Sequence, residues 1–315
     1  MLRYYRVPVA IILAAILAAA PSLAQQGEQT LKLTSDLVVV DVTVMDKNGN
    51  FIRDLKAEDF AIYEDGELQK LDFFEASEQV ALTRPLAVVF ALDISGSVTP
   101  EEIDKQRQAT ESFMKLVQPE SVFAVVAFNH EIHELQGFTS DPNKIRQAFQ
   151  KIKKPEGLTR IFATLDKSVT MLKRAPRFRN GRRLRRVVIV ITDGYDSADS
   201  VDQSFLIQRA NEAEVTVYSV TLPSYSPGLA GNRVMTLLDV SEVVPKTGGK
   251  DFSADAKDFT PAFKAIAEEI RHGYTLAYYP PDKSRRDGRV HQIRVEVKRP
   301  GTIVRASRTS YQAGQ

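Results

Sequence analysis

The middle of the chain alternates between two kinds of apolar pattern. Residues 86–92 and 187–191 are continuous apolar runs, which predict strands buried on both faces of a parallel sheet. Apolar residues three and four apart in the segments between them predict amphipathic helices. The helices are expected at residues 101–117, 141–152, 161–172, 201–212, 234–244 and 259–271, and further strands at 121–128, 131–138 and 215–222. This alternation predicts an α/β fold with a doubly wound, mostly parallel sheet flanked by helices.

Both ends of the chain carry short strand patterns separated by turn residues. The strands are expected at residues 37–44, 62–68, 274–279, 290–297 and 303–310. Neither end is large enough to close a core alone, so we expect the two flanks to form one small β-sandwich-like module. The predicted boundaries are 33–80 for the N-terminal β module, 84–272 for the central domain and 273–312 for the C-terminal strands.

The first 24 residues have the features of an export signal. Arg3 and Arg6 give a positive start, residues 7–20 form an apolar run, and Ser22 and Ala24 are the small residues that a signal peptidase recognises. The run is shorter than the roughly 20 residues of a spanning helix. We therefore expect cleavage after Ala24, a secreted or periplasmic location and no transmembrane span in the mature chain.

Charge and cysteine content narrow the function classes. The chain has 42 Lys and Arg and 40 Asp and Glu residues, so loss of the leader with Arg3 and Arg6 leaves a formally neutral protein. This balance does not favour nucleic-acid binding. The absence of cysteine excludes disulfides, zinc–thiolate sites and thiol catalysis. No Gly-x-Ser-x-Gly or phosphate-binding Gly-x-x-x-x-Gly-Lys motif occurs either.

Three stretches bring oxygen ligands to the predicted sheet. The strand at residues 86–92 runs into Asp93, Ser95 and Ser97, Thr159 opens the helix expected at 161, and Asp193 follows the strand at 187–191. The carboxyl ends of parallel strands are where open α/β sheets bind ligands. Carboxylates and hydroxyls without His or Cys suit Mg²⁺, Mn²⁺ or Ca²⁺. Single residues of this kind are also common helix caps and turn formers, but the ordered five favour a metal.

This ordered set resembles the von Willebrand factor type A (VWA) domain with a complete metal-ion-dependent adhesion site. The resemblance spans about residues 84–272. It implies a Rossmann-like fold and a Mg²⁺ ion, with Mn²⁺ or Ca²⁺ as alternatives, whose ligand shell a partner protein completes with an Asp or Glu carboxylate. The implied metal ligands are Asp93, Ser95, Ser97, Thr159 and Asp193. The wider chain is similar to bacterial exported proteins that carry such a domain between β-rich flanks.

The sequence therefore predicts an exported adhesion or scaffold module and not an enzyme, with two alternatives. A hydrolase would use the same cation as a Lewis acid. A metal-free scaffold would bind an anionic partner through the basic run at residues 173–186, which a solvated loop also explains. The residues that such a partner would contact are Arg177, Arg179, Arg182 and Arg183. The partner and the oligomeric state are not determined by the sequence.

Other polar residues are expected to be structural. Asp41, Asp46 and Asp65 have the composition of a calcium site, but turn chemistry explains them better. His130 and His133 lie three apart near the strand expected at 131–138. Strand alternation would place them on opposite faces, which disfavours a shared metal.

Overall fold

The computed structural model describes residues 37–76, 84–152, 155–193, 201–222, 241–255 and 257–314. The central sheet has the strand order β12-β11-β10-β5-β6-β7, in which all strands are parallel except the antiparallel edge strand β7. Its strands are β5 (Leu86–Asp93), β6 (Val122–Phe128), β7 (Ile132–Thr139), β10 (Arg185–Thr192), β11 (Val215–Thr221) and β12 (Asp251–Ser253). The predicted doubly wound α/β fold is therefore confirmed.

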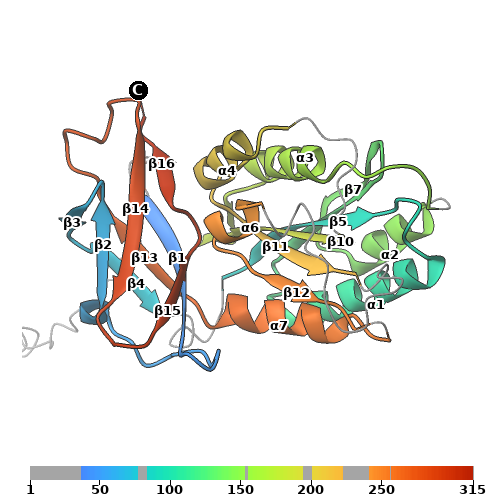
Figure 1. Ribbon diagram of the computed structural model, residues 1–315, viewed down its shortest axis with the longest axis horizontal. Coiled ribbons are helices and arrows are strands. Elements are labelled where there is room, and N and C mark those ends of the chain that lie inside the picture. The colour runs from blue at the N-terminus through green and yellow to red at the C-terminus, as the bar shows by residue number, and fades with distance from the viewer. Residues whose placement is uncertain are drawn as a thin grey trace, which may run out of the picture. The chain divides into compact units, whose positions relative to one another are not determined.

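Helices cover both faces of this sheet (Figure 1). They are α1 (Pro100–Leu116), α2 (Pro142–Gln150), α3 (Ile161–Arg174), α4 (Gln203–Glu212), α6 (Val243–Lys246) and α7 (Thr260–Arg271). Successive side chains of β5 point to opposite faces of the sheet. Phe90 packs in the core beneath α1, α2 and α7, and Val89 packs in the core beneath α3, α4 and α6. This two-sided burial explains the uninterrupted apolar run. No helix among the described residues is long and apolar enough to cross a membrane.

Strands from the two flanks of the chain share two four-stranded sheets, with the orders β15-β1-β13-β4 and β16-β14-β2-β3. The strands are β1 (Val38–Met45), β2 (Phe60–Glu64), β3 (Glu67–Gln69), β4 (Phe73–Ala76), β13 (Tyr274–Tyr278), β14 (Val290–Val297), β15 (Ile303–Ala306) and β16 (Ser310–Gln312), with a short 3₁₀ helix at Ala57–Asp59. Both sheets contribute to one apolar core that contains Val40, Ile62, Leu276 and Ile293. We call these strands the flank module.

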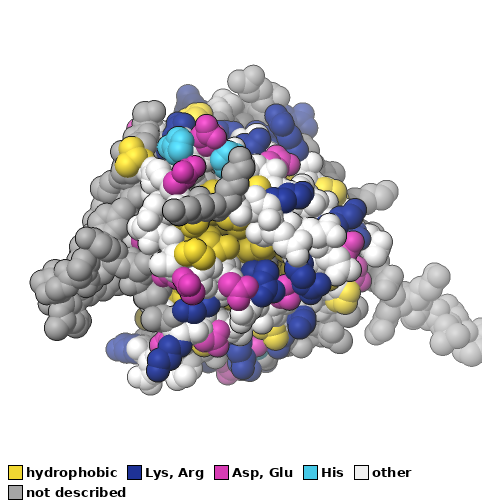
Figure 2. All heavy atoms as spheres, turned by 90° about the vertical axis from the view of Figure 1, so that its right-hand side faces the viewer, with side chains coloured by type: hydrophobic (Ala, Val, Ile, Leu, Met, Phe, Trp, Pro, Cys, Tyr) yellow, Lys and Arg dark blue, Asp and Glu magenta, His cyan; other side chains and the backbone are white. Residues whose placement is uncertain are grey.

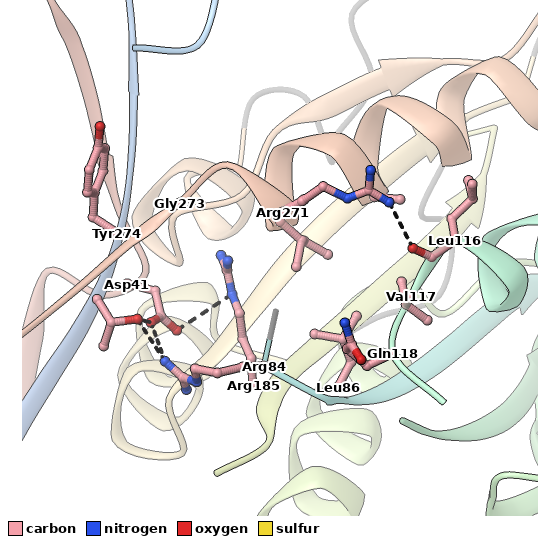
Figure 3. Close-up of a pocket in the computed structure, with 13 residues that line it drawn as sticks. Asp41, Arg84, Leu86, Leu116, Val117, Gln118, Arg185, Arg271, Gly273 and Tyr274 are labelled. Carbon is pink, nitrogen blue, oxygen red and sulfur yellow. Dashed lines mark hydrogen bonds and ion pairs between the residues drawn. The ribbon is translucent and has the colours of Figure 1, made fainter. Parts of the chain in front are cut away.

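A buried ion cluster connects the flank module to the start of the central sheet (Figure 3). Asp41 of β1 accepts a hydrogen bond of 2.7 Å from Arg84 and lies 3.6 Å from the Arg185 guanidinium. Thr275 of β13 donates to the same carboxylate at 2.7 Å. Burial alone would raise the pKa of Asp41, but the two arginines and Thr275 hold it well below its usual range. The expectation that Asp41 is a turn residue is therefore wrong, whereas Asp46 and Asp65 do lie in turns.

The basic run is more ordered than a solvated loop. Strands β8 (Phe178–Arg179) and β9 (Arg182–Arg183) form a two-stranded hairpin. The turn between them contains Asn180 and Gly181, both with positive φ, as a tight hairpin turn requires. The run then enters β10, whose first residues Arg185 and Arg186 are buried.

Three sequence predictions lie wholly or partly outside the described residues. The proposed signal segment at 1–24 is one of them. The helix expected at 234–244 falls largely within residues 223–240, and the short α6 begins only at Val243. The N-terminal β module, predicted at 33–80, is described from residue 37 to 76.

Candidate functional site

The loop after β5 is shaped by its own hydrogen bonds. The backbone NH of Ser95 donates to Asp93 Oδ1 at 2.8 Å, which bends the chain directly after the strand. Thr99 caps α1, since its hydroxyl accepts from the NH of Glu102, and the Glu102 carboxylate accepts from the NH of Thr99. This capping box was visible in the sequence as Thr-Pro-Glu-Glu. The loop between Asp93 and Thr99 is therefore held at both ends.

The end of β10 lies beside this loop, because β5 and β10 are neighbouring parallel strands. The Thr192 hydroxyl donates to Asp93 Oδ2 at 2.6 Å. The Ser97 hydroxyl donates to Asp193 Oδ2 at 2.5 Å and lies 3.1 Å from the Ser95 hydroxyl. Asp93, Ser95, Ser97 and Asp193 are thus joined in one cluster of oxygen atoms.

The loop that carries Thr159 is attached to the same place. The NH of Gly96 donates to the carbonyl of Gly157 at 3.1 Å, and the NH of Glu156 donates to the carbonyl of Ile94 at 3.0 Å. Thr159 is buried, with 4% of its surface exposed. The structure therefore brings the loops of all five predicted site residues to the carboxyl edge of the sheet, and hydrogen bonds connect Asp93, Ser95, Ser97 and Asp193.

The charges in this cluster fit a divalent cation. Asp93 is fully buried, and its pKa is raised to about 6. Burial is the main cause, and the nearby Asp193 carboxylate acts in the same direction. Hydrogen bonds from Ser95 and Thr192 lower the pKa and offset part of this rise. Two carboxylates and neutral hydroxyls are ligands of the kind that Mg²⁺ prefers. The described residues contain no group of three or more His, Cys, Asp or Glu side chains that could hold a metal ion, so this cluster relies on hydroxyls beside its two carboxylates.

Two neighbouring residues that sequence reasoning missed support the site. Thr192 fixes the second oxygen of Asp93, and Asn129 joins two loops, since its Nδ2 donates to the carbonyl of Glu156 at 2.9 Å and its Oδ1 accepts from the NH of Glu131 at 2.8 Å. Thr192 could have been assigned to the site from the sequence, because it directly precedes Asp193 at the end of a predicted strand. Asn129 carries no such signal, because its partner lies 27 positions away.

His130 and His133 do not diverge as expected. His130 lies in the turn before β7 and not in the strand, so strand alternation does not apply to the pair. Both line one cavity beside the Gly157 loop. In the view of Figure 2, histidine side chains (cyan) lie next to acidic side chains (magenta) at the upper rim of the molecule.

The four arginines proposed as an anionic-partner contact have different environments. Arg183 is largely buried and pairs with Glu214, and burial lowers its pKa to about 9. Arg179 donates to the hydroxyl of Ser140 at 3.2 Å. Arg177 is exposed and Arg182 is partly exposed. Three members of this set therefore remain at the surface, whereas Arg183 has the surroundings of a structural residue.

Comparison with known proteins gives one strong match. A sequence model of the von Willebrand factor type A domain matches residues 87–263, more than half of the chain. No curated protein matches the sequence.

Solved structures resemble the chain only distantly. A von Willebrand factor type A protein from Catenulispora acidiphila is 12% identical, with 82% of this chain and 74% of that chain covered and a TM-score of 0.48. An aerotolerance-related membrane protein from Bacteroides fragilis NCTC 9343 is 18% identical, with 59% and 98% covered and a TM-score of 0.45. The vWF domain of a type V pili tip protein from Porphyromonas gingivalis is 13% identical, with 60% and 96% covered and a TM-score of 0.46. These similarities are too distant to transfer a ligand or partner.

Proposed function

Because this chain belongs to the von Willebrand factor type A domain family, a family of protein-interaction modules, we propose that it binds a partner protein through a divalent cation. The cation, Mg²⁺ or else Mn²⁺ or Ca²⁺, would be held by Asp93, Ser95, Ser97, Thr159 and Asp193. The observation that carries the proposal is the connected oxygen cluster at the sheet edge, in which Ser97 bridges the loops after β5 and β10.

The donor set explains why the ion would take a ligand from outside. Asp93 and Asp193 bring two negative charges, and the three hydroxyls bring none, so protein ligands only just neutralise a divalent ion. When bound, such an ion attracts a further anionic oxygen, and the Asp or Glu carboxylate of a partner supplies one. Asp93, Ser95, Thr159 and Asp193 are buried and Ser97 is exposed, so these residues would hold the ion at the carboxyl edge of the sheet.

We propose that the protein works outside the cytoplasm as an adhesion or scaffold module without catalysis. The sequence of residues 1–24 supports export. The absence of a general base among the five site residues supports binding over hydrolysis, because carboxylates and hydroxyls that hold a cation are not free to accept a proton.

Calorimetric titration of chelator-stripped mature protein with Mg²⁺ and Mn²⁺ tests this function. We expect one ion bound per chain and at least about tenfold weaker binding by the double variant Ser95→Ala/Ser97→Ala, which removes two ligands but no charge. Ser140→Ala, an exposed serine of the same α/β domain, is the matched control and should bind as the wild type does. Equal metal binding by the wild type and the double variant would contradict the proposed site.

A further inference from the structure

A cavity of about 300 Å³ lies beside the candidate metal site. Its walls come from the end of β6, the start of β7, the end of α2 and the loop after β5. The apolar part of its lining consists of Ile94, Ala127, Leu135 and Ile152. An apolar cavity of about half this volume can hold a benzene molecule, so one aromatic ring or branched side chain fits here.

The cavity and the candidate metal site share one loop. Ile94 stands between the proposed ligands Asp93 and Ser95, and its backbone is fixed on both sides: its NH donates to the carbonyl of Phe128 at 2.8 Å and its carbonyl accepts from the NH of Glu156 at 3.0 Å. The candidate metal site and the cavity therefore adjoin at Ile94.

The Gly157 loop is fitted closely to the cavity rim. Gly157 has φ +81°, and a Cβ at this position would lie 2.3 Å from Nδ1 of His130. Glycine is thus required both by the backbone conformation and by the close approach of the imidazole ring. The close packing of His130 against Gly157 therefore fixes the imidazole ring at the rim of the cavity.

Two polar side chains of the lining have partners within the protein. His133 lies 3.5 Å from the Glu131 carboxylate, and Lys151 Nζ donates to the carbonyl of Leu135 at 3.2 Å. The lining carries both signs of charge, since Lys151 stands with Glu131 and Glu156. The apolar share of the lining, Ile94, Ala127, Leu135 and Ile152, is the part that an apolar side chain would contact.

From these observations we propose that the cavity binds a large apolar side chain, aromatic or branched aliphatic, that neighbours the acidic residue bound at the cation. The inference rests on the proposed function and specifies the partner further, as a protein segment in which an Asp or Glu stands next to an apolar anchor. In such a pair, the ion orients the partner segment through its carboxylate, and the cavity strengthens binding by burying the apolar side chain. One buried apolar anchor contributes strongly to the affinity of an interface.

The cavity itself is tested with p-cresol, a small aromatic probe that needs no metal. Methyl NMR of the metal-free protein should show saturable shifts that are largest at Ile94, Ala127, Leu135 and Ile152. Ala127→Leu extends a side chain into the cavity from β6 and should weaken p-cresol binding about tenfold or more. Ala61→Leu, at a partly exposed alanine of β2, is the matched control and should bind p-cresol as the wild type does. Absence of saturable shifts, or equal binding by Ala127→Leu, would overturn the inference.

The link to the cation is tested with short peptides in Mg²⁺. Acetyl-Gly-Phe-Asp-Gly-amide and acetyl-Gly-Asp-Phe-Gly-amide place the ring on either side of the aspartate, and acetyl-Gly-Gly-Asp-Gly-amide is the reference. We expect one phenylalanine peptide to bind about tenfold tighter than the reference, and this advantage to disappear in Ala127→Leu. A second variant, Leu135→Asp, should act in the same way by making the floor polar.

The outcomes separate the two proposals. Mg²⁺ titration of Ala127→Leu and Leu135→Asp should match the wild type, which shows that both variants are folded. Mg²⁺-dependent binding of the reference peptide without any gain from phenylalanine would overturn the cavity inference alone. Binding of p-cresol with no effect of Mg²⁺ on any peptide would instead overturn the proposed function, and with it the pairing of anchor and ion.

Discussion

At the scale of single residues, the structure depends on buried polar side chains with several partners. His291 is an example in the flank module: it is buried, lies over Tyr311, and contacts Asp65 Oδ2 through Nδ1 at 2.7 Å and Asp287 Oδ1 through Nε2 at 3.0 Å. Burial by itself would lower the pKa of His291, but the two carboxylates more than offset this and raise it. Only the protonated ring can donate through both nitrogens at once.

We therefore expect the stability contributed by His291 to depend on pH. Because its folded pKa is raised, the contribution is fully present below the unfolded value of about 6.5 and is lost as pH rises through the higher folded pKa. His291→Gln should lower the free energy of unfolding by about 1–2 kcal/mol at pH 6 and by less at pH 9. Urea unfolding at the two pH values measures this.

The more exposed His133 provides the control for this measurement. His133→Gln should leave the free energy of unfolding unchanged at both pH values, since its contact with Glu131 is an exposed pair. A difference between wild type and His291→Gln that stays constant from pH 6 to pH 9 would contradict the protonated bridge between Asp65 and Asp287.

At the scale of elements, glycines decide how closely neighbouring segments approach. Two glycines end helix α6. Gly248 has φ +76°, and its NH donates to the carbonyl of Pro245. The NH of Gly249 donates to the carbonyl of Val244. A Cβ at Gly249 would lie 1.7 Å from the carbonyl oxygen of Val217 in β11. A Gly-Gly pair after an apolar helical segment is a local sequence signal for such a C-cap, but the contact with β11 belongs to the tertiary fold.

Gly249→Ala should accordingly destabilise the protein. We expect a loss of about 2–3 kcal/mol in the free energy of unfolding, because the new methyl group meets a strand carbonyl that cannot move without breaking sheet hydrogen bonds. Gly137→Ala in β7 is the control: its Cβ would have only a flexible Glu134 oxygen within 4 Å, at 3.5 Å. Chemical denaturation of both variants measures the difference, and similar stability of the two would contradict the steric argument.

At the scale of the whole chain, its two flanks and its central sheet are joined by buried charges. Asp41 contacts Arg84, two residues before β5, and Arg185 of β10. The Asp41 NH donates to the Ser307 hydroxyl at 2.9 Å. These residues lie far apart in the sequence, so only the folded chain brings their charges together. Removing the Asp41 carboxylate takes from both arginines the negative charge that they share.

Asp41→Asn is therefore expected to lower the free energy of unfolding by about 3 kcal/mol, since the amide keeps the size of the side chain but leaves two arginines without their carboxylate. Asp54→Asn, at a more exposed ion pair with Arg299, is the matched control and should leave the free energy of unfolding nearly unchanged, because solvent screens this pair. Urea denaturation of both variants provides the comparison. Equal stability of Asp41→Asn and the wild type would show that the buried cluster does not hold the flank module to the sheet.

The sequence by itself determined the α/β fold and the positions of Asp93 and Asp193. Buried parallel strands need unbroken apolar runs, and each run ends where polar residues resume, so the carboxyl edge can be located from local pattern alone. The hairpin and capping signals were equally local, because Asn-Gly and Thr-Pro-Glu-Glu act through neighbouring backbone groups.

Only the tertiary structure decided what distant segments do together. It paired Asp41 with Arg84 and Arg185, joined Ser97 to Asp193, and placed His130 and His133 on one cavity. These contacts depend on strand order and loop path, which bring residues together across many positions of the chain. A residue type records what a side chain can bind, but its partner is set by packing of the whole fold.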